Sequence, residues 1–473
     1  MTRRDLTLLS ISLTLLLLPM IAINLEGQEN APPPPHEPIL IFGDAALNET
    51  HGVAGGSGSA DDPYIISGLW FNCTNTTGIT IENFTGHLLL ENLYFIRGFE
   101  QGNPHVTVRN STNISIRSCW SYLSFKGLEV VNSSDIAVDT AFFVGSQIGL
   151  EFTDCRNVLI KECYSSYAVQ SGFHFVDTEG ITMEACLSEH NNAVLGGSNG
   201  VFADRCRDVE IRDSEFSLCY GSGMMFLGDL QGPISSDISI SGCYFDNNHN
   251  GIFGEAVDGI HIKDGYFSQN TYSIYISIGT DINVEASRFF KNDYGPYLIE
   301  TDSSSIENSN FEGNDFGIIL DGSSDVRITG NSFMNTSSVS VSIGTFGSVL
   351  ISSGNSVHSN RFLSPSPLRG HALDNGRGNS WDSGGKGNLW LSFGYPDRDG
   401  NGIVDQPYHI GGNASTTDKY PISHGLLKPE EEPEPVRERI EANDVYWTVM
   451  ASAGAAVMLL FALILLFTGR NRH

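Results

Sequence analysis

The segment from Asp397 to Asp405 carries the side chains best suited to bind a hard cation. It reads D-x-D-x-N-G-x-x-D, so oxygen-bearing residues alternate along the chain and a glycine allows a sharp turn. Calcium loops supply carboxylate and amide oxygens at such alternate positions, together with one backbone carbonyl. The bidentate glutamate of the twelfth position is missing, because Tyr408 stands there. We predict a structural calcium site rather than only a polar turn. Its ligands would be Asp397, Asp399, Asn401, the carbonyl of Ile403, and Asp405.

A second group of acidic side chains has the composition that glycan cleavage requires. A glycosidase needs two carboxyl groups at a set separation, and a lyase needs a base beside a bound uronate. The four candidates are Asp213, Glu215, Asp246 and Asp264. The same residues are equally compatible with surface charge, and the motifs G-H-G and N-T-D of polygalacturonases are absent.

A repeat with a period of about 22 residues must position these side chains. Apolar-x-apolar triplets begin at Ile114, Ile136, Val158, Ile181, Val209, Ile238, Ile260, Ile282, Ser304, Val326 and Val349. Most steps between them match this period, while two are distinctly longer, from Ile181 to Val209 and from Val209 to Ile238. Phenylalanines recur at Phe216, Phe245, Phe267, Phe289, Phe311 and Phe333, and asparagines at Asn248, Asn270, Asn292 and Asn314. One coil cannot bury its apolar face alone, but stacked coils bury a continuous column.

This pattern predicts an all-β right-handed parallel β-helix, a pectin-lyase-like solenoid, over residues 39–386, with a C-terminal cap at 387–424. A leucine-rich repeat has a similar period but requires leucine at fixed positions, which these coils lack. The recurrent phenylalanines predict an internal aromatic stack, and the asparagines predict a ladder of amide hydrogen bonds. Outward charges of alternating sign from Arg117 to Glu285 predict ion pairs between neighbouring coils.

The two long steps predict loop insertions at residues 189–200 and 220–236. Insertions in adjacent repeats often lie on one face, which is often the binding face. The candidate ligand-binding residues there are His190, Asn191, Asn192, Tyr220 and Met224. Tolerated surface loops are the alternative interpretation.

Cysteine and histidine patterns give no metal or redox motif. The eight cysteines contain no C-x-x-C, and the histidines form no H-E-x-x-H. Copper binding is not expected, because no cluster of methionine and histidine is present. Four cysteines occupy the small corner position of the repeat, which favours buried thiols; Cys163 and Cys186, on adjacent coils, are the pair placed to form a disulfide.

Both ends of the chain predict a membrane location. Residues 1–27 have arginines before an apolar run, as in a signal peptide, although the lack of a clear cleavage site leaves an uncleaved anchor open. Residues 445–468 carry no charge and, as a helix, would span about 36 Å, enough for a single transmembrane helix. Arginines in the tail, residues 469–473, put that end inside and the body outside. Linkers flank the body: a Pro-rich segment at 28–38 and an acidic stalk at 425–444.

Charge and sequons add two further predictions. The net charge is −29, with only 26 Lys and Arg against 55 Asp and Glu, which argues against nucleic-acid binding. An exported chain permits glycosylation at N-x-S/T. The sequons are Asn48, Asn72, Asn75, Asn83, Asn110, Asn113, Asn132, Asn335 and Asn413.

Two end motifs resemble those of exported NosD-like β-helix proteins, which are common in archaea. The first runs from His51 through Gly55–Gly58 to Ile66, and the second includes Gly387–Trp390, Asp397–Asp405 and Asp418–Pro421. The resemblance implies two roles: maturation of a copper site, for which this chain lacks a clear ligand cluster, and binding or hydrolysis of glycans. We therefore expect a calcium-stabilised, membrane-anchored cell-surface β-helix that binds carbohydrate or surface proteins. The alternatives are a polysaccharide lyase or glycosidase and a copper-maturation accessory protein.

Overall fold

The computed structural model describes residues 34–44, 47–48, 51–191, 197–344, 348–365, 367–368 and 370–424. The described residues from His36 to His424 belong to one compact unit. The predicted signal segment 1–27, most of the linker 28–38, the stalk 425–444, the membrane helix 445–468 and the tail lie outside the described residues. Within the described ranges, no helix is long and apolar enough to cross a membrane.

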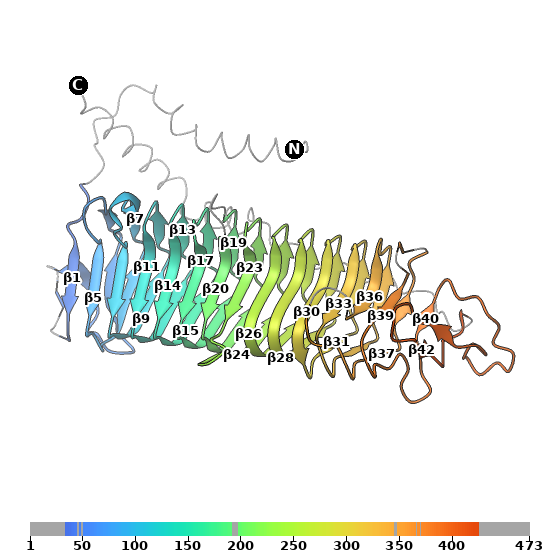
Figure 1. Ribbon diagram of the computed structural model, residues 1–473. Helices are drawn as coiled ribbons and strands as arrows, with labels where there is room; N and C mark the ends of the chain where they lie inside the picture. The colour runs from blue at the N-terminus through green and yellow to red at the C-terminus, as the bar shows by residue number, and fades with distance from the viewer. Residues whose placement is uncertain are drawn as a thin grey trace, which may run out of the picture. The chain divides into compact units, whose positions relative to one another are not determined.

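The described part of this unit is a right-handed parallel β-solenoid in which each coil contributes strands to three faces (Figure 1). One representative coil contains β11 (Lys126–Val131), β12 (Ser134–Asp139) and β13 (Phe142–Val144). Each strand pairs in parallel with its equivalent one coil on, as in Leu128 with Leu150 and Ile136 with Val158. The prediction of an all-β parallel β-helix is confirmed.

The first and second faces join into one 26-stranded sheet, and the third face is a 14-stranded sheet. The first face comprises β1 (Ile39–Phe42), β5 (Ile79–Glu82), β8 (Val106–Arg109), β11, β14 (Ile148–Thr153), β17 (Ser171–Val176), β20 (Asn199–Asp204), β23 (Ser222–Leu227), β26 (Asn250–Lys263), β28 (Tyr272–Glu285), β30 (Tyr294–Asp302), β33 (Phe316–Asp321), β36 (Val339–Ile343) and β39 (Ala372–Asp374). The second comprises β3 (Tyr64–Ser67), β6 (Leu88–Glu91), β9 (Thr112–Arg117), β12, β15 (Arg156–Lys161), β18 (Glu179–Glu184), β21 (Arg207–Arg212), β24 (Ser235–Ser241), the later halves of β26 and β28, β31 (Ser305–Glu307), β34 (Arg327–Thr329) and β37 (Ser356–His358).

The third face consists of short strands. These are β4 (Trp70–Asn72), β7 (Tyr94–Ile96), β10 (Trp120–Tyr122), β13, β16 (Tyr164–Ser166), β19 (Leu187–Glu189), β22 (Glu215–Ser217), β25 (Tyr244–Asp246), β27 (Tyr266–Ser268), β29 (Arg288–Phe290), β32 (Asn310–Glu312), β35 (Ser332–Met334), β38 (Arg361–Phe362) and β40 (Leu389–Trp390). Outside the faces lie β2 (Val53–Gly55), antiparallel to β3, a 3₁₀ turn at Phe99–Gln101, and the antiparallel pair β41 (Tyr408–His409) and β42 (Thr417–Asp418).

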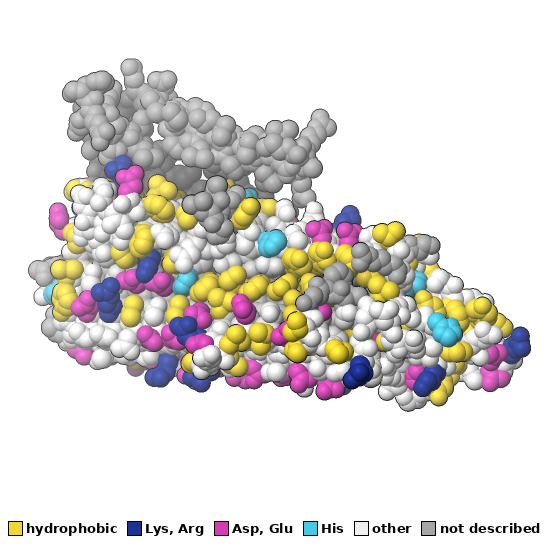
Figure 2. All heavy atoms as spheres, viewed as in Figure 1, with side chains coloured by type: hydrophobic (Ala, Val, Ile, Leu, Met, Phe, Trp, Pro, Cys, Tyr) yellow, Lys and Arg dark blue, Asp and Glu magenta, His cyan; other side chains and the backbone are white. Residues whose placement is uncertain are grey.

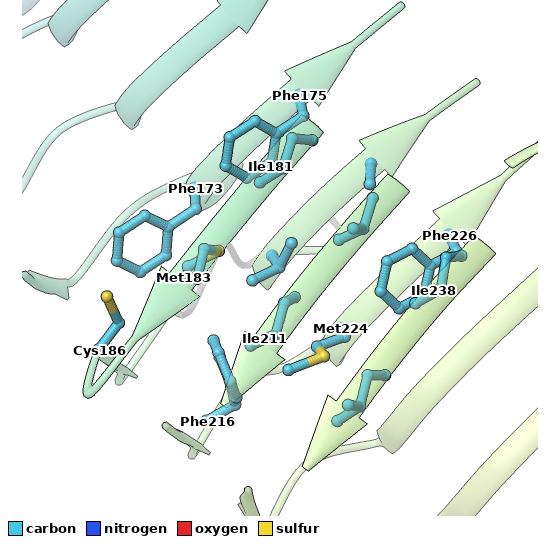
Figure 3. Close-up of a cluster of buried hydrophobic side chains, with 14 of the residues drawn as sticks. Phe173, Phe175, Ile181, Met183, Cys186, Ile211, Phe216, Met224, Phe226 and Ile238 are labelled. Atoms are coloured by element: carbon cyan, nitrogen blue, oxygen red, sulfur yellow. The ribbon is translucent and has the colours of Figure 1, made fainter. Parts of the chain in front are cut away.

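Inward side chains of all three faces form continuous stacks along the solenoid. The predicted phenylalanine stack is present, with ring centroids of successive members 4.5–5.8 Å apart from Phe216 to Phe333. It continues through Phe362 and Trp390 to Tyr408. Figure 3 shows Phe173, Phe175, Ile181 and Met183 of neighbouring strands pointing into this shared interior. Burial of these side chains supplies the main driving force for stacking the coils.

The predicted asparagine ladder is also present. The Nδ2 group of Asn248 donates to Oδ1 of Asn270 at 3.1 Å, and Asn270 and Asn292 donate onward in the same way at 3.0 Å. Each Nδ2 also donates to a backbone carbonyl, such as that of Phe216 for Asn248. The ladder therefore satisfies polar groups at corners where the backbone leaves its sheets.

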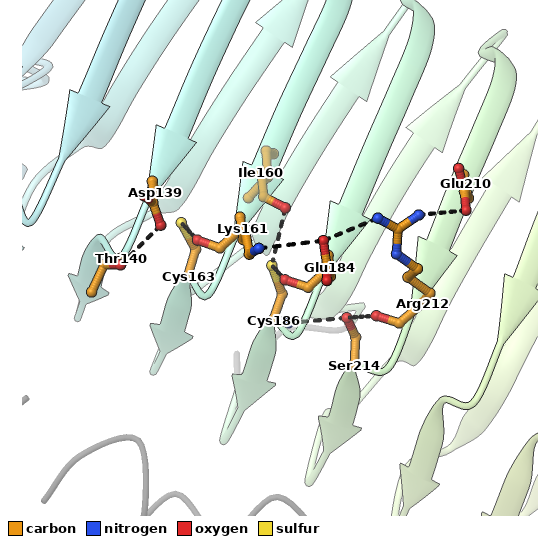
Figure 4. Close-up of polar contacts among 10 residues, drawn as sticks. All are labelled: Asp139, Thr140, Ile160, Lys161, Cys163, Glu184, Cys186, Glu210, Arg212 and Ser214. Carbon is orange, nitrogen blue, oxygen red and sulfur yellow. Dashed lines mark hydrogen bonds and ion pairs between the residues drawn. The ribbon is translucent and has the colours of Figure 1, made fainter. Parts of the chain in front are cut away.

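The corner cysteines are buried thiols, and none of the eight is in a disulfide. Burial raises the pKa of Cys186 to about 12, so this thiol stays protonated and unreactive. The outward charges alternate as predicted: Lys161 and Arg212 lie 3.7 Å and 3.0 Å from Glu184 (Figure 4). These pairs are partly exposed and fix the register of the coils more than they add stability.

Two details of the predicted repeat are wrong. Val349 does not start a coil triplet: its side chain is 93% exposed, and Asn355 occupies the equivalent position beside Val326. The reason is an insertion in that coil, which shifts the true strand to β37. The two predicted insertions, at 189–200 and 220–236, also do not lie on one face of the solenoid. The first insertion lies between the third and first faces, before β20, and the second lies between β23 and β24.

Candidate functional site

The acidic loop 397–405 folds on itself through its own backbone. The carboxylate of Asp397 accepts hydrogen bonds from the Asn401 and Gly402 N–H groups at 3.1 Å and 2.8 Å. Oδ1 of Asn401 accepts the Ile403 N–H at 2.8 Å, and Oδ2 of Asp405 accepts the Arg398 N–H at 3.2 Å. Across the described part of the chain, no group of three His, Cys, Asp or Glu side chains is arranged to hold a metal. Calcium at this loop stays a prediction.

Asp418 ends an asparagine ladder in the C-terminal segment. Its Oδ2 accepts the Asn388 N–H at 2.7 Å and the Trp390 indole N–H at 2.9 Å. Asn388 in turn is the last step of a ladder from Asn331 through Asn360. The carboxylate is fully buried, and burial is the main cause that raises its pKa. These contacts make Asp418 a structural cap.

The four candidate catalytic carboxylates occupy different positions in the coils. Asp213 and Asp264 lie at the same corner but two coils apart, with Gly242 between them, or about 10 Å at the strand spacing. Glu215 is buried at the start of β22, level with Tyr244. Asp246 ends β25, level with Ser217 and Ser268, whose hydroxyl donates to it. The structure therefore does not bring all four to one point.

Of the candidate loop residues, His190 and Tyr220 reach the surface. The His190 ring is stacked 5.3 Å from Tyr167, and Tyr220 is 62% exposed. Two assignments are wrong. Met224 is fully buried because its position in β23 points into the core beside Val201. Asn191 is also fully buried, and its side-chain amide donates hydrogen bonds to the Ser188 hydroxyl and to the Asn199 carbonyl at the same corner. Asn192 lies outside the described residues.

The sequon asparagines are exposed, except for Asn113, which is half-buried and donates to the Thr85 carbonyl. Three of them stack on successive coils: Asn132 donates to Asn110 at 2.8 Å, and Asn110 donates to Asn83 at 3.3 Å. Because neighbouring coils are only about 4.8 Å apart, glycans on all three would collide. Glycosylation stays a prediction, with at most some of these three positions modified together.

A band of aromatic side chains on the outer surface of the first face was not anticipated from the sequence. Figure 2 shows hydrophobic side chains gathered along the middle of the visible face, over the strands from β20 to β33. The register places Phe202, Met225, Phe253, Tyr275 and Tyr297 on successive coils. A parallel column holds Tyr272, Tyr294 and Phe316. We call these seven aromatic residues, without Met225, the aromatic band.

The band points outward because strand residues alternate between the two sides of a sheet. Ile274 and Ile276 are fully buried, whereas Tyr275 between them is half-buried. The other members of the band are half-buried as well. Tyr272, Tyr294 and Phe316 therefore present part of their surface to solvent on consecutive coils. The same region of an ordinary solenoid surface is polar.

The rings of the second column are stacked with a sideways offset. Tyr272 and Tyr294 have centroids 4.7 Å apart at 14°, and Tyr294 and Phe316 have centroids 4.9 Å apart at 9°. Carbon atoms in contact lie about 3.5 Å apart, so neighbouring rings slip sideways by about 3 Å and leave part of each face open. Phe253 and Tyr275 are parallel at 5.5 Å, and Tyr275 stands at 79° to Tyr272. The band thus combines ring faces and ring edges.

Carboxylates flank the band on both sides. Burial and then the charges of Glu255 and Asp321 raise the pKa of Tyr275, and the Tyr297 hydroxyl lies 3.5 Å from Asp321. On the opposite side, burial and the neighbouring Asp315 raise the pKa of Asp293. Residues 222–227, 250–257, 272–279, 294–302 and 316–321, which carry most of the band, contain no Lys or Arg.

The N-terminal end of the band is polar. His174 stacks on Phe202 with centroids 4.5 Å apart, and its Nδ1 lies 2.9 Å from the Ser171 hydroxyl. Burial lowers the pKa of His174 to about 4, so the ring is neutral near pH 7. Beyond it, Lys126 forms ion pairs with Glu129 and Glu151. A sequence signal for the band existed in the Tyr-x-x-Tyr motif, which occurs at Tyr272–Tyr275 and returns one coil later at Tyr294–Tyr297.

Comparison with known families matches two parts of the chain. Residues 188–348 and 234–394 match the family described as periplasmic copper-binding protein (NosD). Residues 65–229 match the right-handed beta helix region. No protein with a curated function matches in sequence.

Solved structures with similar folds are distant in sequence. The A-module of a mannuronan C-5 epimerase of Azotobacter vinelandii is 12% identical, covers 68% of this chain and 90% of its own, and has a TM-score of 0.34. The catalytic unit of an α-1,3-glucanase of Streptomyces thermodiastaticus is 11% identical over 73% of both chains, at 0.46. The surface adhesin PfbA of Streptococcus pneumoniae is 10% identical over 75% and 86%, at 0.37. At these scores the likenesses carry no argument about activity. The chain is a right-handed parallel β-helix whose middle and later coils are NosD-like.

Proposed function

We propose that this protein is an exported, membrane-anchored surface β-helix that binds an extended glycan along the aromatic band. The observation that carries the proposal is the run of half-buried rings on consecutive coils of the first face. Sugars have apolar C–H faces that pack on aromatic rings, while phenol hydroxyls bond to sugar hydroxyls. A contiguous outward apolar surface rimmed by polar groups is typical of a binding site. The export and anchor segments, 1–27 and 445–468, support a surface location.

Glycan binding by purified full-length protein in detergent tests this proposal. We expect Tyr275→Ala with Tyr297→Ala to weaken binding at least tenfold, because the double variant removes two adjacent rings of the band. The matched control is Tyr244→Ala with Tyr266→Ala, a half-buried pair 5.1 Å apart on the third face. Equal loss in both double variants, or no binding of any extended glycan by the native protein, would overturn the proposal.

The same experiment examines the enzymatic alternative. Shortened glycan products, abolished in variants of Asp213, Glu215, Asp246 or Asp264, would replace binding with cleavage as the function. Because these carboxylates are not gathered at one point, we expect intact glycan at the end of the incubation.

We further propose that calcium stabilises the loop 397–405. Four side chains with oxygen atoms lie close together in the chain there, and their backbone hydrogen bonds hold the loop in a closed turn. We expect chelator to lower the melting temperature of the native protein by a few degrees and to have no effect on Asp397→Asn with Asp399→Asn. An identical melting temperature with calcium and with chelator would reduce the loop to a polar turn.

The NosD match makes copper-site maturation the second candidate. It is favoured only by the matched residues 188–394, since no cluster of metal ligands is found across the described ranges. Saturable uptake of copper by the metal-free protein would promote this candidate, and we expect none.

A further inference from the structure

The charges around the aromatic band identify the kind of glycan that fits it. We infer that the band takes a glycan whose sugars carry free amino groups. This inference rests on the proposed function and adds the charge of the ligand. It follows from two rows of carboxylates, one on each side of the rings, and from the absence of cations on the strand segments between them.

The first row borders the corner at which each coil enters the first face. Asp293 and Asp315 directly precede Tyr294 and Phe316 on adjacent coils, and both are exposed. The nearest cation in the sequence is Lys291, whose ammonium group lies over the Phe290 ring at 4.7 Å on the third face. It is therefore directed away from the carboxylate row and does not neutralise it.

The second row borders the corner between the first and second faces. It contains exposed Glu255, half-buried Glu300 and buried Asp321. Glu300 and Asp321 accept hydrogen bonds from Ser348, at 2.9 Å and 3.2 Å, and no Lys or Arg pairs with either residue in the described ranges. Within the described ranges, no ion pair with Lys or Arg therefore neutralises the carboxylates of this row.

An amino sugar matches this arrangement in two ways. Its ring packs against tyrosine and phenylalanine, and its ammonium group is attracted both by the carboxylate rows and by the negative face of an aromatic ring. A polyuronate would meet like charge on both sides and find no Lys or Arg on the band strands, so its binding is disfavoured. A fully N-acetylated chain gains the ring contacts but no ionic attraction.

The test compares three hexamers of β-1,4-linked or α-1,4-linked sugars on the full-length protein: glucosamine, N-acetylglucosamine and galacturonate. We expect the glucosamine hexamer to bind at least tenfold more tightly than the acetylated hexamer at low salt, with the advantage shrinking as salt is raised. We expect no binding of the galacturonate hexamer. Glu255→Gln with Asp293→Asn should reduce the glucosamine advantage about three- to tenfold and leave the acetylated hexamer unchanged.

The control variant is Glu312→Gln, which changes an exposed carboxylate of β32 on the third face. Tighter binding of the acetylated or the galacturonate hexamer would overturn the inference but leave the proposed function intact. No binding of any hexamer or longer glycan would defeat the proposed function itself. Equal binding of a lysine hexamer, or full binding of glucosamine by Tyr275→Ala with Tyr297→Ala, would show general charge attraction and also overturn the inference.

Discussion

Burial of His105 makes the stability of the protein depend on pH. The side chain is fully buried; its Nδ1 lies 2.8 Å from the Ser121 hydroxyl, and its Nε2 lies against the Arg97 carbonyl. The ring also stacks on Phe95 at 5.6 Å. Burial lowers the pKa of His105 to about 4, because a charged imidazolium would lose its hydration in this interior.

Acid should therefore destabilise the protein through His105. The folded pKa lies below the ordinary value of about 6.5, so the stability is fully present above that pH and is lost as the pH falls towards 4, by about 3 kcal/mol at most. Urea unfolding between pH 7 and pH 4 should show a shallower loss for His105→Gln than for the native protein. Part of the acid-induced loss of stability remains in this variant, because burial also lowers the pKa values of His174 and His371 to about 4. His261→Gln, at an exposed position, is the control, and equal slopes in all three proteins would contradict the prediction.

The asparagine ladders show how elements are held together beyond the strands. Each amide from Asn248 to Asn292 donates one hydrogen bond to the next coil and one to a backbone carbonyl of the preceding coil, so one side chain joins three coils. Asn292, for example, accepts the Asn270 amide and backbone N–H groups and donates to Asn314 and the Phe267 carbonyl.

Removal of one rung should weaken this arrangement measurably. Asn292→Ala leaves buried groups of Asn270 and Phe267 without partners, and each unsatisfied group costs about 1–3 kcal/mol. We expect a loss of about 2–4 kcal/mol in the free energy of unfolding, measured by urea titration. Asn310→Ala, at an exposed position of β32, should cost well under about 1 kcal/mol. A loss for Asn292→Ala as small as that for Asn310→Ala would show that the ladder adds little.

At the scale of the whole solenoid, the C-terminal segment closes the open end of the stack. Trp390 covers Phe362 at 4.2 Å and is itself covered by Tyr408 at 3.9 Å. A second buried carboxylate, Asp374, ends another ladder and holds the Trp381 indole at 3.0 Å. Two tryptophan–aspartate pairs thus protect the last apolar layer and the last ladder groups from water. A solenoid requires such a cap, because its final coil has no neighbour to bury it.

Trp390→Ala should expose that layer. We expect about 3–5 kcal/mol of local destabilisation, together with concentration-dependent self-association through the exposed end. Amide exchange should accelerate in β38 and β40 and remain unchanged in β11 to β15, since each coil contacts mainly its neighbours. Light scattering measures the association. Trp120→Ala, on the outer side of the third face, is the control, and uniform exchange across the solenoid in Trp390→Ala would contradict a local cap.

The sequence by itself determined the parallel β-helix, the phenylalanine stack, the asparagine ladder and the alternating charges. Each of these depends on a residue type that returns once per coil, and stacked coils turn that regular spacing directly into contact. Tertiary structure alone decided which residues of a coil face outward at a break in the period. Met224 and Asn191 lie inside, Val349 lies outside, and the two insertions lie at different corners. Residue types alone do not show this, because an insertion shifts which of the following residues face inward. The Tyr-x-x-Tyr repeat was a sequence signal for the tyrosines of the aromatic band, but only the register of the strands placed Phe202 and Phe316 in line with them.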